Sequence, residues 1–219
     1  MKKPSFLKRD NALGLFNDTK QRLGLLQNKK RENSFIPALH RLFGENPSKG
    51  RVARIGNSDF TYHSLKKTLV SFLPTSWEEE LVRTKAEWPG CQNWWAGFPF
   101  IALMEILPDG DGISGTLRLH AEVGPVADHG KRRAVILAIQ KAAITNDSLR
   151  IRFPIGATDK GRLYSRFLTG NDAPVSDIHD AANVEESMKS LVAEFEPEFA
   201  LVADVLSRWT PSELSDCGP

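Results

Sequence analysis

Cysteine is nearly absent from this sequence of 219 residues: only Cys91 and Cys217 are present, far apart in the chain. Two such residues support neither a disulfide framework nor a thiolate metal site. No apolar run reaches the roughly eighteen residues that a membrane-spanning helix needs. The basic N-terminus is not followed by the apolar stretch of a secretion signal. We therefore expect a cytoplasmic protein with no membrane partner.

Short catalytic signatures are also missing. The sequence contains no P-loop and no GxGxxG, HExxH, GxSxG or CxxC pattern. Its five histidines are scattered, and none has the spacing of a zinc ligand set. Function must therefore be inferred from the arrangement of charged and aromatic residues.

The stretch from Trp94 to Ile144 predicts the central unit of the fold. Phe98–Leu107 is a nearly continuous apolar run of strand length, which is typical of a strand buried on both faces. The segment 108–112 (PDGDG) has the composition of a turn, and Thr116–Val123 alternates as a second strand. After this strand, Asp128 can cap a helix that opens with three basic residues.

Weaker patterns complete the prediction. We expect an α+β fold: a small mixed or antiparallel sheet packed with helices. The predicted strands are 51–55, 98–107, 116–123 and 149–153; residues 162–167 are either a further short strand or a helical turn, and 170–174 is a loop. Besides the helix after Asp128, the predicted helices run from Asp59 through Leu73, from Trp77 to Ala86 after a capping box at Ser76, and from Asn183 with a break or restart at Pro197.

The domain organisation follows from composition. Residues 34–209 are predicted to form a single α+β domain. A basic N-terminal arm or helix over 1–33 precedes it, and a disordered tail over 210–219 follows it.

Charge is distributed unevenly along the chain. Residues 1–31 hold nine Lys and Arg against two acids, and residues 131–166 repeat those counts, so each block carries +7. Residues 172–219 hold eleven acids against two bases and carry −9. The blocks can neutralise one another in the fold or across an oligomer. Alternatively, the basic residues form a polyanion-binding face. The second interpretation predicts phosphate contacts from Arg132, Arg133, Arg150, Arg152, Lys160, Arg162 and Arg166.

Aromatic residues gather near the turn before the first central strand. Trp88, Trp94 and Trp95 lie within eight residues, and Tyr164 lies between two arginines in the second basic block. Such aromatics either seal the edge of a core or form a surface for base stacking or partner contact.

The pattern Pro108-Asp109, then Glu122 on the following strand, then a helix resembles the PD-(D/E)XK nuclease superfamily. That resemblance implies a Mg²⁺ ion held by the carboxylates of Asp109 and Glu122, which activates water for phosphodiester cleavage. The superfamily has a Lys two residues after the Glu, whereas this chain has Gly124 there. Lys131 or Arg133 would have to substitute from the helix. On any other interpretation we expect no cofactor.

A broader resemblance covers residues 75–208. The tryptophan cluster, the strand that ends at Gly124-Pro125, Arg133, and Tyr164-Ser165-Arg166-Phe167 resemble the C-terminal portion of bacterial and phage PD-(D/E)XK-like proteins. It implies a restriction-like or phage-defence context, with no complete catalytic centre in this chain.

These patterns lead to one main functional hypothesis and two alternatives. The main hypothesis is a nucleic-acid-associated accessory or binding protein that contacts DNA or RNA non-specifically, alone or as a subunit of a complex. The alternatives are a Mg²⁺-dependent nuclease and a protein-interaction scaffold with a partner protein or a second copy of the chain.

Overall fold

One antiparallel sheet organises the part of the chain that this computed structural model describes, residues 32–85, 88–94, 97–146 and 148–209. Its seven strands are β1 (Val52–Ile55), β2 (Ser58–Lys66), β3 (Leu69–Pro74), β4 (Phe100–Pro108), β5 (Gly115–Val123), β6 (Ser165–Arg166) and β7 (Asp172–Val175). The strands lie in the order β1 to β6, and β7 also pairs with β5. Short β6 pairs with the end of β5 and β7 with its beginning, so the two share one edge.

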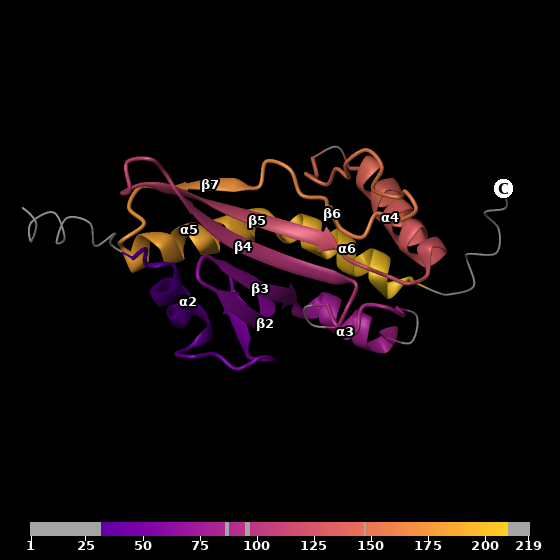
Figure 1. Cartoon of the computed structure of the whole chain (residues 1–219), viewed down its shortest axis with the longest axis horizontal. Coiled ribbons are helices and arrows are strands. Elements are labelled where there is room, and N and C mark those ends of the chain that lie inside the picture. The colour runs from indigo at the N-terminus through magenta and orange to yellow at the C-terminus, as the bar shows by residue number, and fades with distance from the viewer. Residues whose placement is uncertain (1–31, 86–87, 95–96, 147, 210–219) are drawn as a thin grey trace, which may run out of the picture. The chain divides into compact units, whose positions relative to one another are not determined.

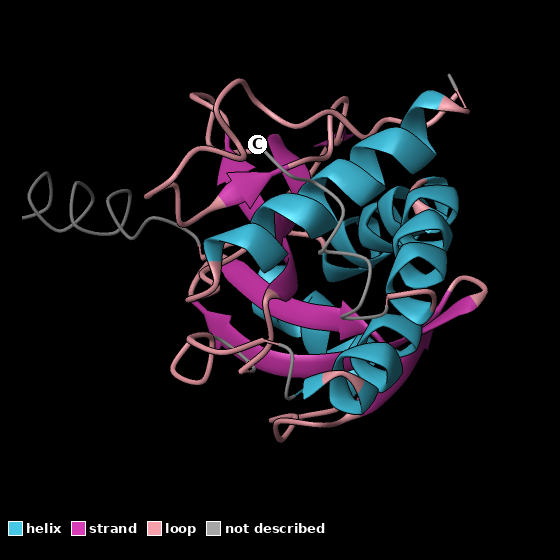
Figure 2. Cartoon of the chain, turned by 90° about the vertical axis from the view of Figure 1, so that its right-hand side faces the viewer, coloured by secondary structure: helices cyan, strands magenta, loops and turns pink. Residues whose placement is uncertain are grey.

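Five helices pack with this sheet in the described residues. They are α2 (Phe35–Phe43), α3 (Thr75–Arg83), α4 (His129–Ile144), α5 (Ala181–Glu194) and α6 (Glu196–Ser207). Helices α5 and α6 follow one another along one side of the sheet (Figure 1). Figure 2 shows the strands curving around the helices. The predicted α+β class, with an antiparallel sheet, is confirmed.

Aromatic side chains fill the space between the sheet and the helices. Phe60 on β2 meets Phe72 on β3 and Phe199 on α6 edge to face. Trp77 on α3 packs on Phe199 and Phe100, and its indole N–H donates to the carbonyl of Phe199 at 2.8 Å. Burying a tryptophan with its polar atom paired removes a large apolar surface from water without leaving a donor unsatisfied.

The two central strands match their predictions. The first five residues of β4 are buried, so both faces of that strand are covered there. On β5 the predicted apolar face is buried in the core. Asp128 caps α4, since its side chain accepts a hydrogen bond from the amide of Lys131.

The predicted helix from Asp59 to Leu73 is wrong: this segment forms the hairpin of β2 and β3. Leu65, Leu69 and Leu73 have helical spacing, but Tyr62 pairs with Phe72 across the hairpin. Cross-strand aromatic packing against the core outweighs the local helical pattern.

Four other boundaries differ from the prediction. The predicted strand 149–153 is reduced to a single bridge between Ile151 and Leu168. The segment 162–167, expected as a short strand or a helical turn, contains only β6, and the expected loop 170–174 contains most of β7. Helix α3 begins at Thr75 without a side-chain cap from Ser76. The Pro197 prediction holds as a restart, because α6 begins one residue earlier.

All of these elements belong to one compact unit that begins at Asn33. The predicted N-terminal arm, except its last two residues, and the predicted tail lie outside the described residues. In the described part of the chain, no helix combines the length and the apolar character needed to cross a bilayer.

Candidate nucleic-acid interface

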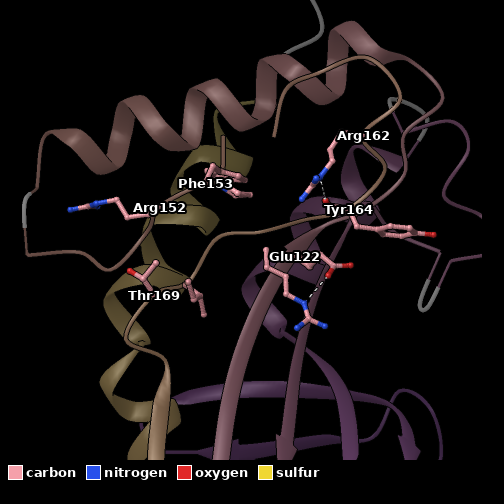
Figure 3. Close-up of a pocket in the computed structure, with 9 residues that line it drawn as sticks. Glu122, Arg152, Phe153, Arg162, Tyr164 and Thr169 are labelled. Carbon is pink, nitrogen blue, oxygen red and sulfur yellow. Dashed lines mark hydrogen bonds and ion pairs between the residues drawn. The ribbon is translucent and has the colours of Figure 1, made fainter. Parts of the chain in front are cut away.

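Three of the arginines expected to contact phosphate line one open pocket of about 580 Å³ next to β6 (Figure 3). We call it the arginine pocket. Its walls are formed by Glu122, Arg152, Phe153, Pro154, Arg162, Tyr164, Arg166, Leu168 and Thr169. The lining thus holds three arginines and one carboxylate, an excess of positive charge that gives the pocket a positive potential.

Glu122 and Arg166 are brought together by strand pairing. Glu122 is on the outer face of β5 and lies opposite Arg166 of β6 in the register. The Nε atom of Arg166 donates to Oε2 of Glu122 at 3.1 Å. Glu122 is only 8% exposed, whereas Arg166 is exposed. The carboxylate is thus neutralised within the pocket, while the arginine keeps part of its guanidinium open to a ligand.

Arg162 and Arg152 differ from Arg166 because neither forms a salt bridge with any described residue. Arg162 donates from Nε to the carbonyl of Tyr164 at 3.0 Å. Arg152 donates to the carbonyls of Leu149 and Ile151. In Figure 3 the Arg152 guanidinium points away from Arg162 and Tyr164. Arg162 and Arg166 therefore supply the charge on the Tyr164 side of the pocket.

Arg132 is a correction to the predicted phosphate contacts, because its side chain is only 2% exposed. Its guanidinium donates to the carbonyls of Gly124 (3.1 Å) and Ala157 (2.7 Å) and to Oγ of Ser165 (2.8 Å). Burial lowers the pKa of Arg132, and the nearby positive charge of Arg162 adds to this effect. Through these hydrogen bonds Arg132 connects the end of β5 to Ala157, in the loop before β6, and to Ser165 of β6. It is a positioning residue for the pocket.

Arg150 is a second correction, since acids of the last two helices engage it. It lies 3.4 Å from the carboxylate of Glu194 and 3.5 Å from that of buried Glu198. Its guanidinium carbon stacks 3.6 Å above the Phe195 ring. These contacts make Arg150 a structural clamp on α5 and α6 instead of a phosphate ligand.

The remaining predicted cations lie outside the arginine pocket. Arg133 is exposed near the start of α4, and Lys160 is exposed in the loop that precedes β6. Lys131, one proposed substitute for a catalytic lysine, lies in the first turn of α4. None of the three is among the residues that line the pocket.

The predicted aromatic cluster is divided between core and surface. Trp88 is 1% exposed and stacks on Trp209 with ring centroids 5.2 Å apart, so it belongs to the core. Trp94 packs over Gly124, where an added Cβ would lie 2.3 Å from its ring, and its centroid lies 6.1 Å from that of Tyr164. Tyr164 is 47% exposed. Trp95 lies outside the described residues.

The predicted metal pair is wrong. Asp109 follows the end of β4, where Pro108 pairs with Gly115, while Glu122 lies seven residues further along β5. At about 3.4 Å per residue, the two positions are roughly 24 Å apart. Asp109 instead accepts a hydrogen bond from Ser114 Oγ at 2.7 Å. Within the described ranges, no three His, Cys, Asp or Glu side chains are grouped to hold a metal ion.

The outer face of β5 contains partners that the sequence did not reveal. Arg118 binds Asp172 of β7 at 2.6 Å, which raises the pKa of Arg118. His120 lies 3.0 Å from Glu105 of β4. Burial lowers the pKa of His120, although the hydrogen bond to Glu105 opposes this shift. Only the strand register, which no local pattern supplies, identifies these partners.

Comparison of the chain with protein-family models, curated proteins and solved structures finds no match. The resemblance to the PD-(D/E)XK superfamily therefore stays a prediction. The chemistry of the pocket must be interpreted from its own residues.

Proposed function

We propose that this protein binds nucleic acid through the arginine pocket, mainly by contacts to phosphate and without sequence preference. The observation that carries the proposal is the convergence of Arg162, Arg166 and Tyr164 on one open pocket. These residues come from one short segment, and the pairing of β6 with β5 places that segment at the edge of the sheet.

The chemistry of the pocket supports a phosphate ligand. Guanidinium groups donate two parallel hydrogen bonds to phosphate oxygens. Among the described residues that line the pocket, Glu122 is the one carboxylate that would repel such an anion, and its ion pair with Arg166 neutralises it. Contacts of this kind provide affinity and position but carry little sequence information.

The proposed role is that of a binding or accessory protein. Because Asp109 and Glu122 are far apart, the nuclease mechanism that used this pair has no support from the geometry. The restriction-like or phage-defence context, and any partner subunit, remain predictions that come from the resemblance.

Fluorescence anisotropy with a labelled oligonucleotide tests the proposal directly. Binding through two or three phosphate contacts predicts that the logarithm of the binding constant falls linearly with the logarithm of salt concentration, with a slope of roughly −1.4 to −2.7. An oligonucleotide that shows no salt-sensitive binding even at low ionic strength contradicts the proposed function.

A further inference from the structure

A second hollow adjoins the arginine pocket. It measures about 510 Å³ and is lined by Lys66, Leu69, Trp94 and Leu103. Its remaining walls are Glu122, Tyr164 and Arg166, which also line the arginine pocket. The two hollows share these three residues in their walls, and we call the two hollows together the sheet groove.

The strand register places the second hollow on the outer face of the sheet. Leu103 pairs with His120, and Ile101 pairs with Glu122, so Leu103 and Glu122 share a face. Leu69 pairs with Glu105, which lies opposite Arg118, and Lys66 pairs with Leu69. The sheet groove therefore crosses β3, β4 and β5 on the side opposite the core.

Two aromatic rings line the sheet groove. The centroids of Trp94 and Tyr164 lie 6.1 Å apart, and the rings are tilted by 40°. Trp94 packs closely on Gly124, whereas Tyr164 is 47% exposed. A packed ring beside an exposed ring offers π-faces on which a planar base can stack.

Cationic side chains accompany the rings along the groove. Lys66 lines the second hollow, Arg162 lines the arginine pocket, and Arg166 lines both. Cations that flank aromatic rings along a groove match a ligand whose phosphates and bases are both accessible.

We propose that the sheet groove binds single-stranded DNA or RNA, with bases stacked on Trp94 and Tyr164 and the phosphate backbone along Arg166 and Arg162. This inference rests on the proposed nucleic-acid function and specifies its ligand. In a duplex the bases stack on one another and present only their edges, so a double strand reaches the arginines but gains nothing from the rings. The groove therefore favours the unpaired strand.

Anisotropy titrations at one salt concentration test the preference. The probes are oligo(dT) and oligo(rU) of about 20 nucleotides, and a DNA duplex of equal length. We expect at least one single strand to bind about tenfold more tightly than the duplex. Tyr164→Leu should weaken single-strand binding about fivefold or more and weaken duplex binding by a clearly smaller factor. Leu163→Ala, at the neighbouring exposed position, is the matched variant and should change neither.

Each outcome decides a different claim. A duplex that binds as tightly as both single strands, or a Tyr164→Leu variant that behaves like the wild type, overturns the single-strand inference and leaves the proposed function standing. Failure of every probe to bind overturns both. Tyr164 is exposed, so we expect Tyr164→Leu to fold like the wild type. An unchanged melting temperature will verify this.

Discussion

Arg166 and Glu122 form an ion pair across the β5–β6 register, with Nε and Oε2 3.1 Å apart. The sequence assigned these residues to different chemistries, one to phosphate and the other to a metal ion. In the structure they neutralise each other at the centre of the groove. This ion pair explains how an otherwise cationic pocket can contain a carboxylate. It also provides a test that distinguishes phosphate binding from metal binding.

Glu122→Gln should raise the affinity for nucleic acid several-fold. The amide can still accept the hydrogen bond from Arg166, but the pocket loses its negative charge, so the positive charge of the guanidinium is no longer offset. Glu186→Gln makes the same charge change on the exposed surface of α5. The measurement is anisotropy at low salt. An equal gain from Glu186→Gln would show that the effect comes from net charge alone. A loss of affinity in Glu122→Gln would indicate that the Glu122 carboxylate itself binds the ligand.

Arg132→Met should destabilise the protein and weaken nucleic-acid binding together. The substitution keeps an extended side chain but leaves the carbonyls of Gly124 and Ala157 without their buried donor. We expect a loss of about 2–5 kcal/mol in the free energy of unfolding, measured by urea denaturation. Arg133→Met removes the same charge from the next, exposed position. Equal stability of the two variants would refute the positioning role of Arg132.

Arg150→Ala should lower stability without weakening nucleic-acid binding. It removes the clamp on Phe195 and leaves Glu198, which is 2% exposed, without its guanidinium partner. A buried charge that loses its partner costs about 3–5 kcal/mol. Thermal unfolding and anisotropy at a temperature where the variant is folded measure the two effects separately. A folded variant with reduced affinity would return Arg150 to the set of phosphate contacts.

His63→Leu should make the free energy of unfolding less dependent on pH below about pH 6.5. The histidine is 8% exposed, and neither ring nitrogen has a hydrogen-bond partner among the described residues. Burial lowers its pKa below the ordinary 6.5. As the pH falls below 6.5, the unfolded chain takes up a proton that the folded chain refuses, so the free energy of unfolding declines by up to about 1.4 kcal/mol per pH unit.

Urea denaturation of the wild type and His63→Leu between pH 5 and pH 8 checks this sign. The leucine variant should match or exceed the wild type at pH 8, because an unpaired polar group is replaced by an apolar one. Its advantage should grow as the pH falls. Parallel curves for the two proteins would show that His63 is not held neutral by the fold.

Local patterns predicted the parts of this molecule whose environment is local. The alternation over Thr116–Val123 identified a strand and both of its faces. In the second basic block, Arg162, Tyr164 and Arg166 stand two residues apart, and all three line one pocket. Here a period of two was sufficient, because successive side chains of an extended segment point to opposite faces.

The environments of the other predicted site residues depend on contacts between segments that are far apart in the sequence. Arg132 and Arg150 have the same local character as Arg162, but carbonyls and carboxylates from distant segments bury or engage them. The separation of Asp109 from Glu122 was within reach of the sequence, because a turn directly before β5 puts Asp109 at the opposite end of that strand from Glu122. The resemblance to a metal motif obscured this simple consequence of hairpin geometry.

The most direct test of the account compares two double variants that remove equal charge. Arg162→Gln/Arg166→Gln changes the arginine pocket and keeps a donor for Glu122, whereas Arg133→Gln/Lys160→Gln changes exposed cations outside it. Anisotropy over a salt series should show the pocket variant losing about tenfold or more in affinity, with a salt slope shallower by roughly 1.4–1.8. The other variant should change the affinity less than about twofold. Equal losses from the two variants would contradict the claim that the pocket holds the nucleic acid.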